Sequence, residues 1–357
     1  MAHGFHADCR SVLIGSLPVK NHREAAALAW EYSPDIPLWV QLPANPAEGM
    51  IVQFQPGLPG LIPENGKPCI HTQGPGFEAE LVNFYEEYLG VVENQQDPNR
   101  TRFALTRDTA EGFFVFQEML ANPPSVPVAV KGQVTGPITF ATSITDQDNR
   151  AIFYNEQLRD AAVKLLSLKA VWQVKQLSRF KVPVIMFIDE PALAGFGSSE
   201  FTSISRDQVN ACLGEVIEAV KGAGGIPGIH VCANTDWSLI LETSVDIVNF
   251  DAYSFFDRFV LYPDHIRNFV NAGGILAWGI VPTGHGEDID GATPDNLAEK
   301  LREQIGVLEN LGIGKSRILA QSLISPSCGT GSLSYAHALK VLELTKSVSE
   351  ILRKEPA

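Results

Sequence analysis

The stretch VPVIMFID at residues 182–189 decides the fold, because it is an apolar run that ends in an aspartate. A strand with one solvated face alternates apolar and polar residues, whereas a strand covered by helices on both faces is apolar throughout. A helical pattern at about 155–180 precedes this run, and another at 206–223 follows it. The stretch therefore predicts a strand of a parallel sheet within a series of β/α units.

Seven further segments of this kind occur along the chain, each followed by at least one helical pattern. They are SVLIGS (11–16), LWVQL (38–42), VPVAVKG (126–132), IPGIHV (226–231), VDIVNF (245–250), GILAWGI (274–280) and RILAQS (317–322). Eight β/α units in 357 residues predict a single α/β domain over residues 1–357, folded as a (β/α)8 TIM barrel. A doubly wound open sheet is the alternative, because sequence alone does not show closure.

Residues 43–108 separate the second and third predicted strands and are too many for a simple βα loop. The segment is rich in proline and glycine up to about residue 76 and has a helical pattern at 77–92. We expect a long insertion after the second strand, which forms either a lid over the barrel mouth or an extension of the barrel.

The composition favours a cytoplasmic enzyme. The formal net charge is −14, and no run rich in lysine or arginine occurs, so we expect no nucleic-acid partner. No run of 18 apolar residues predicts a membrane span, and the first residues lack the apolar core of a secretory signal. The cysteines are odd in number and scattered, unlike a disulfide framework, which favours a reducing compartment. They are Cys9, Cys69, Cys212, Cys232 and Cys328.

Residues capable of chemistry gather where the predicted strands end, which is where TIM barrels carry their active sites. Asp189 ends an apolar strand, where a charge is costly unless it meets a ligand or partner, so we expect it to be catalytic or to bind substrate. A carboxylate that caps the following turn is the alternative for the Asp189–Glu190 pair. His285 follows the seventh strand and is a candidate acid or base, although its loop is also typical of solvated surface.

His230 and Cys232 point to the same side of an extended segment, because they are two residues apart. Cys328 follows the last strand and can approach from the other side of a barrel mouth. Two thiolates and an imidazole suit Zn²⁺, and three protein ligands leave a fourth position open, as in catalytic sites. The alternative is that these are ordinary buried side chains, since cysteine is among the most frequently buried residues.

An ordered set of motifs resembles the catalytic half of cobalamin-independent methionine synthase. The set consists of IGSLP (14–18), VKGQVTGPIT (130–139), IDEPAL (188–193), IHVC (229–232), VDIVNFD (245–251) and SPSCG (325–329). It is also similar to the methylcobalamin:coenzyme M methyltransferases of the uroporphyrinogen decarboxylase superfamily. The resemblance covers about residues 11–340 and implies a zinc-dependent thiol methyltransferase on a (β/α)8 barrel, with a place in methionine biosynthesis.

The resemblance also implies roles for individual residues. The matches to the zinc ligands are His230, Cys232 and Cys328, and Asp251 stands where the synthase has a glutamate ligand. The segment that receives the carboxylate of the amino-acid substrate matches Ile14, Gly15 and Ser16. The aspartate that holds the substrate's amino group matches Asp189.

Three departures from the synthase pattern affect the substrates. Ala44 stands near the position of an acid that helps to bind the homocysteine amine, no tryptophan follows TGPIT, and the folate-positioning half is absent. We therefore expect a small, homocysteine-like thiol as acceptor and a methyl-corrinoid protein, rather than a folate, as donor.

Two other functions remain as alternatives. The first is a metal-free decarboxylase of the uroporphyrinogen type. Such an enzyme should have arginines early in the barrel to bind the carboxylates of its substrate, but residues 11–43 contain only Arg23. The second alternative is a non-catalytic barrel that belongs to a corrinoid pathway. The sequence has no D-x-H-x-x-G motif, which argues against this chain carrying the corrinoid itself.

Overall fold

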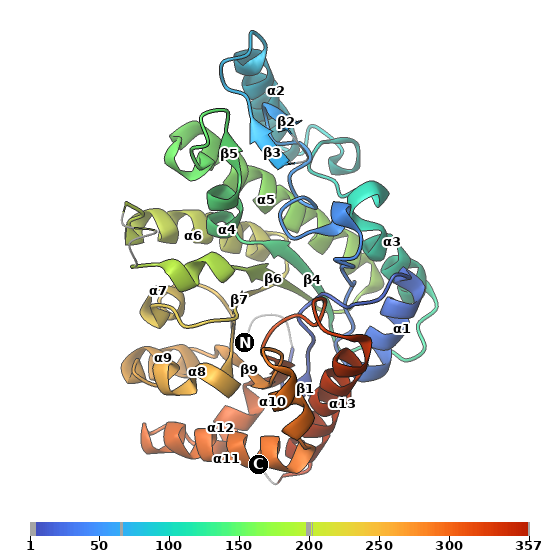
Figure 1. Cartoon of the computed structure of the whole chain (residues 1–357), viewed down its shortest axis with the longest axis vertical. Helices are drawn as coiled ribbons and strands as arrows, with labels where there is room; N and C mark the ends of the chain where they lie inside the picture. The colour runs from blue at the N-terminus through green and yellow to red at the C-terminus, as the bar shows by residue number, and fades with distance from the viewer. Residues whose placement is uncertain (1–4, 65–66, 198–200, 202, 356–357) are drawn as a thin grey trace.

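The computed structural model of the chain describes residues 5–64, 67–197, 201 and 203–355, and its centre is a curled sheet of seven parallel strands (Figure 1). Across the sheet the order is β1 (Arg10–Ser11), β10 (Ser322–Pro326), β9 (Ile275–Val281), β8 (Ile247–Phe250), β7 (Ile226–Val231), β6 (Val184–Asp189) and β4 (Val130–Thr135). Strands that follow one another in this set lie side by side from β4 to β10, as in a series of β/α units.

Residues 38–41 lie between the two edges of the sheet, where an eighth strand was predicted. Leu38 forms an isolated parallel bridge with Lys131 of β4, and Gln41 forms one with Ser16, which follows β1. The Gln41 amide also donates to the Gly15 carbonyl at 2.9 Å. The fold is thus TIM-barrel-like, with seven regular strands and isolated bridges in place of the eighth.

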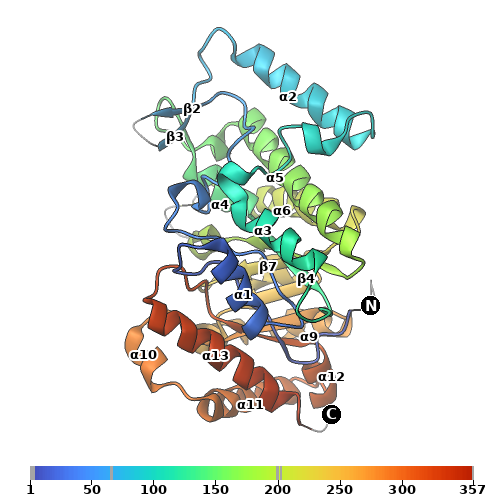
Figure 2. The same cartoon turned by 90° about the vertical axis from the view of Figure 1, so that its right-hand side faces the viewer.

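Helices surround the sheet, and Figure 2 shows α1, α3 and α13 together along one side. The longer helices are α1 (His22–Tyr32), α2 (Phe77–Val92), α3 (Arg107–Ala121), α5 (Glu156–Leu177), α6 (Arg206–Gly222), α8 (Ala252–Phe259), α9 (Pro263–Asn271), α11 (Pro294–Asn310) and α13 (Tyr335–Leu352). The shorter ones are α4 (Pro137–Ser143), α7 (Trp237–Leu241), α10 (Gly286–Gly291) and α12 (Lys315–Ala320). None of the helices in the described ranges is long and apolar enough to cross a membrane.

Two predicted strands were placed wrongly. RILAQS (317–322) is mostly helix α12, and the strand begins only at Ser322, because a short apolar run does not distinguish a buried helix from a buried strand. The strand predicted at 126–132 begins at Val130 instead, and Val126 is 85% exposed. In both cases the buried strand lies a few residues further along the chain.

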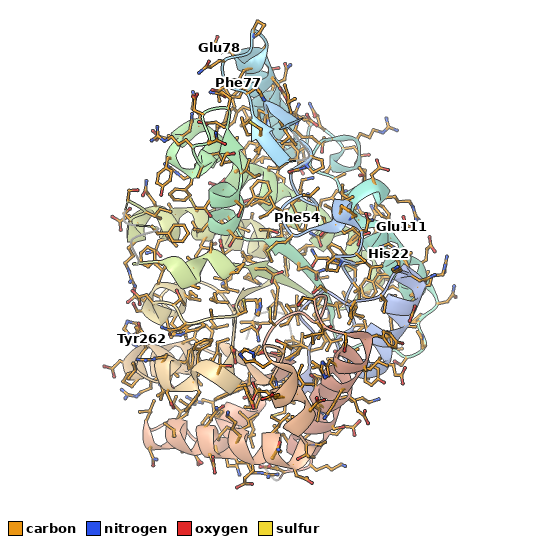
Figure 3. The ribbon with its side chains drawn as sticks, viewed as in Figure 1. His22, Phe54, Phe77, Glu78, Glu111 and Tyr262 are labelled. Carbon is orange, nitrogen blue, oxygen red and sulfur yellow. The ribbon has the colours of Figure 1, made fainter. Side chains whose placement is uncertain are left out.

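The insertion between residues 43 and 108 has structure of its own. It contains α2 at its predicted position and an antiparallel hairpin, β2 (Leu61–Glu64) with β3 (Lys67–Ile70), whose second strand pairs with β5 (Thr145–Asp146). Phe54 and Phe103 are fully buried in the main core. Figure 3 shows Phe77, at the start of α2, near one end of the molecule, with Phe54 closer to the sheet. The insertion is therefore packed into the core and also projects away from it.

Candidate metal centre

Three of the predicted ligands lie together at the carboxyl end of the sheet. His230 is in β7, Cys232 follows that strand, and Cys328 lies in the loop after β10. Their ligand atoms, one imidazole nitrogen and two Sγ atoms, all lie within 4.8 Å of one another. Ligands about 2.0–2.3 Å from a tetrahedral zinc ion lie roughly 3.3–3.8 Å apart, so small side-chain rotations would fit this group to the ion.

Asn249 of β8 fixes the orientation and the tautomer of His230, which is its partner in the β7–β8 register. The Asn249 amide nitrogen donates to the Ala277 carbonyl at 2.8 Å and to the Ser325 hydroxyl at 2.7 Å. Because both amide hydrogens are used, the Asn249 Oδ1 accepts a hydrogen bond from Nδ1–H of His230. The lone pair of the neutral ring is then on Nε2, which is the atom available to a metal.

The two cysteines of the group differ in how readily their thiols lose a proton. The hydrogen bond with Cys328 lowers the pKa of the Cys232 thiol, and His230 acts in the same direction. That hydrogen bond, together with burial, raises the pKa of Cys328. Burial opposes protonation of His230, but its contacts with Cys232 and Asp189 outweigh this and raise its pKa. Both shifts favour a thiolate, the form that binds metals, on Cys232 rather than on Cys328.

Asp251 and His285 lie outside this compact group in the described part of the chain. Asp251 is buried and caps α8, its Oδ1 accepting a hydrogen bond from the Ser254 amide at 2.8 Å. Burial raises the pKa of its carboxyl group. His285 is exposed at the start of α10. The predicted roles of Asp251 as a ligand and of His285 as an acid or base stay predictions.

Asp189 ends β6 and is paired in register with His230. Its side chain is buried, and Oδ1 has no hydrogen-bond partner among the described residues. Burial raises the pKa of this carboxyl group, while His230 and Lys131 act against the shift. Because a buried oxygen without a donor is costly, Asp189 suits a ligand that brings N–H groups of its own.

Ile14, Gly15 and Ser16 line one small cavity together with Cys328. Ser16 forms two hydrogen bonds with the loop that carries Cys328. Its Oγ accepts a hydrogen bond from the Gly331 amide at 3.2 Å, and its carbonyl accepts one from the Thr330 amide at 3.1 Å. A Cβ atom at Gly331 would lie 2.9 Å from the Ser16 Oγ, so glycine permits this close approach. The proposed thiol-binding and metal-binding segments therefore touch.

Glu190, rather than Asp189, is the carboxylate that caps a neighbouring turn. It accepts hydrogen bonds from the Ile138 and Thr139 amides, both at 2.9 Å, and from the Thr139 hydroxyl at 2.7 Å. Burial raises the pKa of Glu190 to about 7. A Cβ atom at Gly136 would lie 2.1 Å from its carboxyl carbon. The glycine of TGPIT therefore makes room for Glu190.

Asn249 is not among the site residues predicted from the sequence, although a signal for it is present there. Asn249 is a single polar residue inside the otherwise apolar segment IVNF, which is buried along its whole length. A polar side chain in such a strand needs a partner, but identifying His230 as that partner requires the register of β7 and β8.

Replacing Asn249 by alanine is expected to weaken zinc binding by about 10- to 100-fold, because His230 loses the hydrogen bond that orients it. Competition with a chromophoric chelator measures the affinity, and Asn268→Ala, at an exposed position of α9, is the control. Equal affinities in the folded Asn249→Ala variant and the wild-type protein would show that Asn249 does not support a ligand.

Comparison with known proteins gives matches by structure alone. No protein-family model matches the chain, and no curated protein matches its sequence. A protein from Listeria monocytogenes, assigned as a vitamin-B12-independent methionine synthase, matches 99% of this chain and 98% of its own length, with a TM-score of 0.54 and 11% identity. A methyltransferase from Methanosarcina mazei matches 91% of this chain and 84% of its own, with a TM-score of 0.53 and 12% identity.

A third similar structure is the B12-independent methionine synthase from Shewanella sp. W3-18-1, solved with selenomethionine. It is 20% identical over 68% of this chain, and the match covers 66% of that protein, just under two thirds, with a TM-score of 0.47. The matches with TM-scores of 0.54 and 0.53 show that the chain shares their fold. The resemblance predicted from the motifs is therefore confirmed at the level of the fold.

Proposed function

We propose that this chain is a zinc-dependent enzyme that transfers a methyl group to a small, homocysteine-like thiol. The group formed by His230, Cys232 and Cys328 carries the proposal, because Asn249 holds Nδ1 of the histidine and so turns Nε2 toward the two cysteines. Zinc held there would deprotonate the acceptor thiol and keep its sulfur nucleophilic. The fold shared with a methyltransferase and with a protein assigned as a methionine synthase supports the same class of reaction.

The acceptor is bound, in this proposal, by residues on two sides of the metal centre. Asp189 provides a buried carboxylate oxygen without a partner among the described residues, which suits the ammonium group of an amino acid. Ile14, Gly15 and Ser16 receive the acceptor's carboxylate next to Cys328. Asp251 is a further candidate ligand at the end of β8.

The donor that we propose is a methyl-corrinoid carried by a partner protein. The acceptor sulfur forms a bond to the methyl carbon as the cobalt–carbon bond breaks, and both electrons of that bond stay on the cobalt. The insertion at 43–108 is proposed as a cover for this region, because the Thr135 hydroxyl at the end of β4 donates to the Met50 carbonyl at 2.6 Å.

Metal analysis combined with a methyl-transfer assay tests the proposal. The purified protein is expected to contain about one zinc per chain and to transfer the methyl group of free methylcobalamin to L-homocysteine. Removal of zinc with a chelator should abolish the reaction, and added zinc should restore it. A protein that binds no zinc, or whose activity survives complete removal of the metal, would refute the proposal.

A further inference from the structure

Lys131 is a wholly buried cation inside the sheet, and it has no role in the function proposed above. Its side chain is 0% exposed, and it lies in β4, whose residues are all buried. Its Nζ donates to the Ile14 carbonyl and to the Gln133 Oε1, the latter at 3.3 Å, and it lies 4.5 Å from the centre of the Phe187 ring. These contacts come from β4, β6 and the segment after β1.

The contact with Ile14 spans the irregular sector of the sheet. Regular pairing of β1 ends at Ser11, and residues 38–41 form only isolated bridges on either side. Lys131 lies beyond that segment, in β4, and its side chain reaches across to Ile14. Side-chain bonds therefore contribute to the position of the Ile14 carbonyl where a continuous backbone ladder is lacking.

Burying the positive charge of Lys131 destabilises the fold unless neighbouring groups interact favourably with that charge. A methionine would fill a similar volume without the cost of removing a cation from water. The groups that compensate for this cost are the Ile14 carbonyl, the Gln133 amide, the Phe187 ring and the carboxylate of Asp189, whose charge favours the ammonium form. Ile14 and Asp189 are the two of these that the proposed function assigns to the acceptor.

We propose that Lys131 is a positioning residue for the acceptor thiol, which it serves by holding the Ile14 carbonyl. In a trans peptide the carbonyl and the following N–H point in opposite directions, so a fixed Ile14 carbonyl also fixes the direction of the Gly15 N–H. This inference rests on the proposed function, in which Ile14, Gly15 and Ser16 receive the carboxylate of the acceptor. It assigns Lys131 no contact with the metal.

Lys131→Met is the informative variant, and Lys169→Met is its matched control. Lys169 is also buried, at 1% exposed, but it lies in α5 and its Nζ donates to the Arg102 carbonyl at 3.3 Å. Binding of L-homocysteine to the cobalt(II)-substituted proteins is followed by the change in visible absorbance. KM and kcat are then measured on the zinc proteins with free methylcobalamin as donor.

The Lys131→Met variant is expected to keep its metal but to bind homocysteine about 10-fold more weakly. This is the size of effect expected for the loss of one charge-assisted hydrogen bond. The effect on KM should be larger than the effect on kcat. Lys131→Arg, which keeps a donor, should restore part of the affinity, and Lys169→Met should bind as the wild-type protein does. If Lys131→Met does not fold, Lys131→Gln is measured against the same 10-fold expectation.

Unchanged homocysteine binding in the lysine-131 variants, or equal weakening in Lys169→Met, would overturn the role of Lys131. A wild-type protein that takes up no metal, or that binds metal but no homocysteine, would instead overturn the proposed function. The two failures are therefore distinguishable, because the first is seen only when the wild-type protein binds both.

Discussion

Replacing both Cys232 and Cys328 by serine is expected to give a folded protein that binds no zinc and transfers no methyl group. Their Sγ atoms are two of the three ligand atoms that lie within 4.8 Å of one another. A serine hydroxyl stays protonated at neutral pH and is a poor substitute for a thiolate, so His230 alone would remain as a strong ligand. The loss should exceed the roughly 10- to 100-fold effect expected for Asn249→Ala, which leaves all three ligands in place.

The control for this prediction is Cys212→Ser, which makes the same chemical change in α6, outside the metal centre. It should leave zinc content and methyl transfer unchanged. Zinc content is measured by elemental analysis, and circular dichroism shows whether each variant is folded. If the double variant were to retain a full equivalent of zinc, the ion would be bound elsewhere and the ligand assignment would be wrong.

Local patterns sufficed for the parts of the fold and site that depend on neighbouring residues. β7 has its predicted bounds at Ile226–Val231, and the spacing of His230 and Cys232 correctly places both side chains in one group. Asn21, a residue type favoured at helix starts, caps α1 by accepting hydrogen bonds from the Arg23 and Glu24 amides. Each of these features is set within a few residues of the chain, where the side-chain period or a cap gives a direct signal.

Features that depend on strand register or on distant partners could not be predicted in this way. The bond between His230 and Asn249 joins two strands, and the contact between Lys131 and Ile14 joins residues that are 117 positions apart. Similarly, the irregular pairing of residues 38–41 reflects how the two sheet edges meet, although LWVQL itself is typical of a strand. Sequence thus predicted which side chains meet in the candidate metal centre better than it predicted which residues hold them in place.

Replacing Asp189 by asparagine is expected to weaken the use of homocysteine by about 30-fold or more in kcat/KM. The substitution keeps the shape of the side chain but removes its charge. The ammonium group of the bound homocysteine is then buried without a counter-ion. Removing one partner of such a pair costs about 2–5 kcal/mol, and each 1.4 kcal/mol corresponds to about tenfold. Zinc content should not change, because Asp189 lies outside the compact ligand group.

A second thiol separates this explanation from general damage to the site. 3-Mercaptopropionate has a carboxylate but no amine, so its affinity for the cobalt(II)-substituted protein should be nearly equal in the wild-type protein and in Asp189→Asn. Asp246→Asn is the matched control, since Asp246 also has a buried oxygen without a partner among the described residues but precedes β8, at the opposite end of the sheet. Equal losses for homocysteine and mercaptopropionate in Asp189→Asn would mean that Asp189 supports the site without binding the amine.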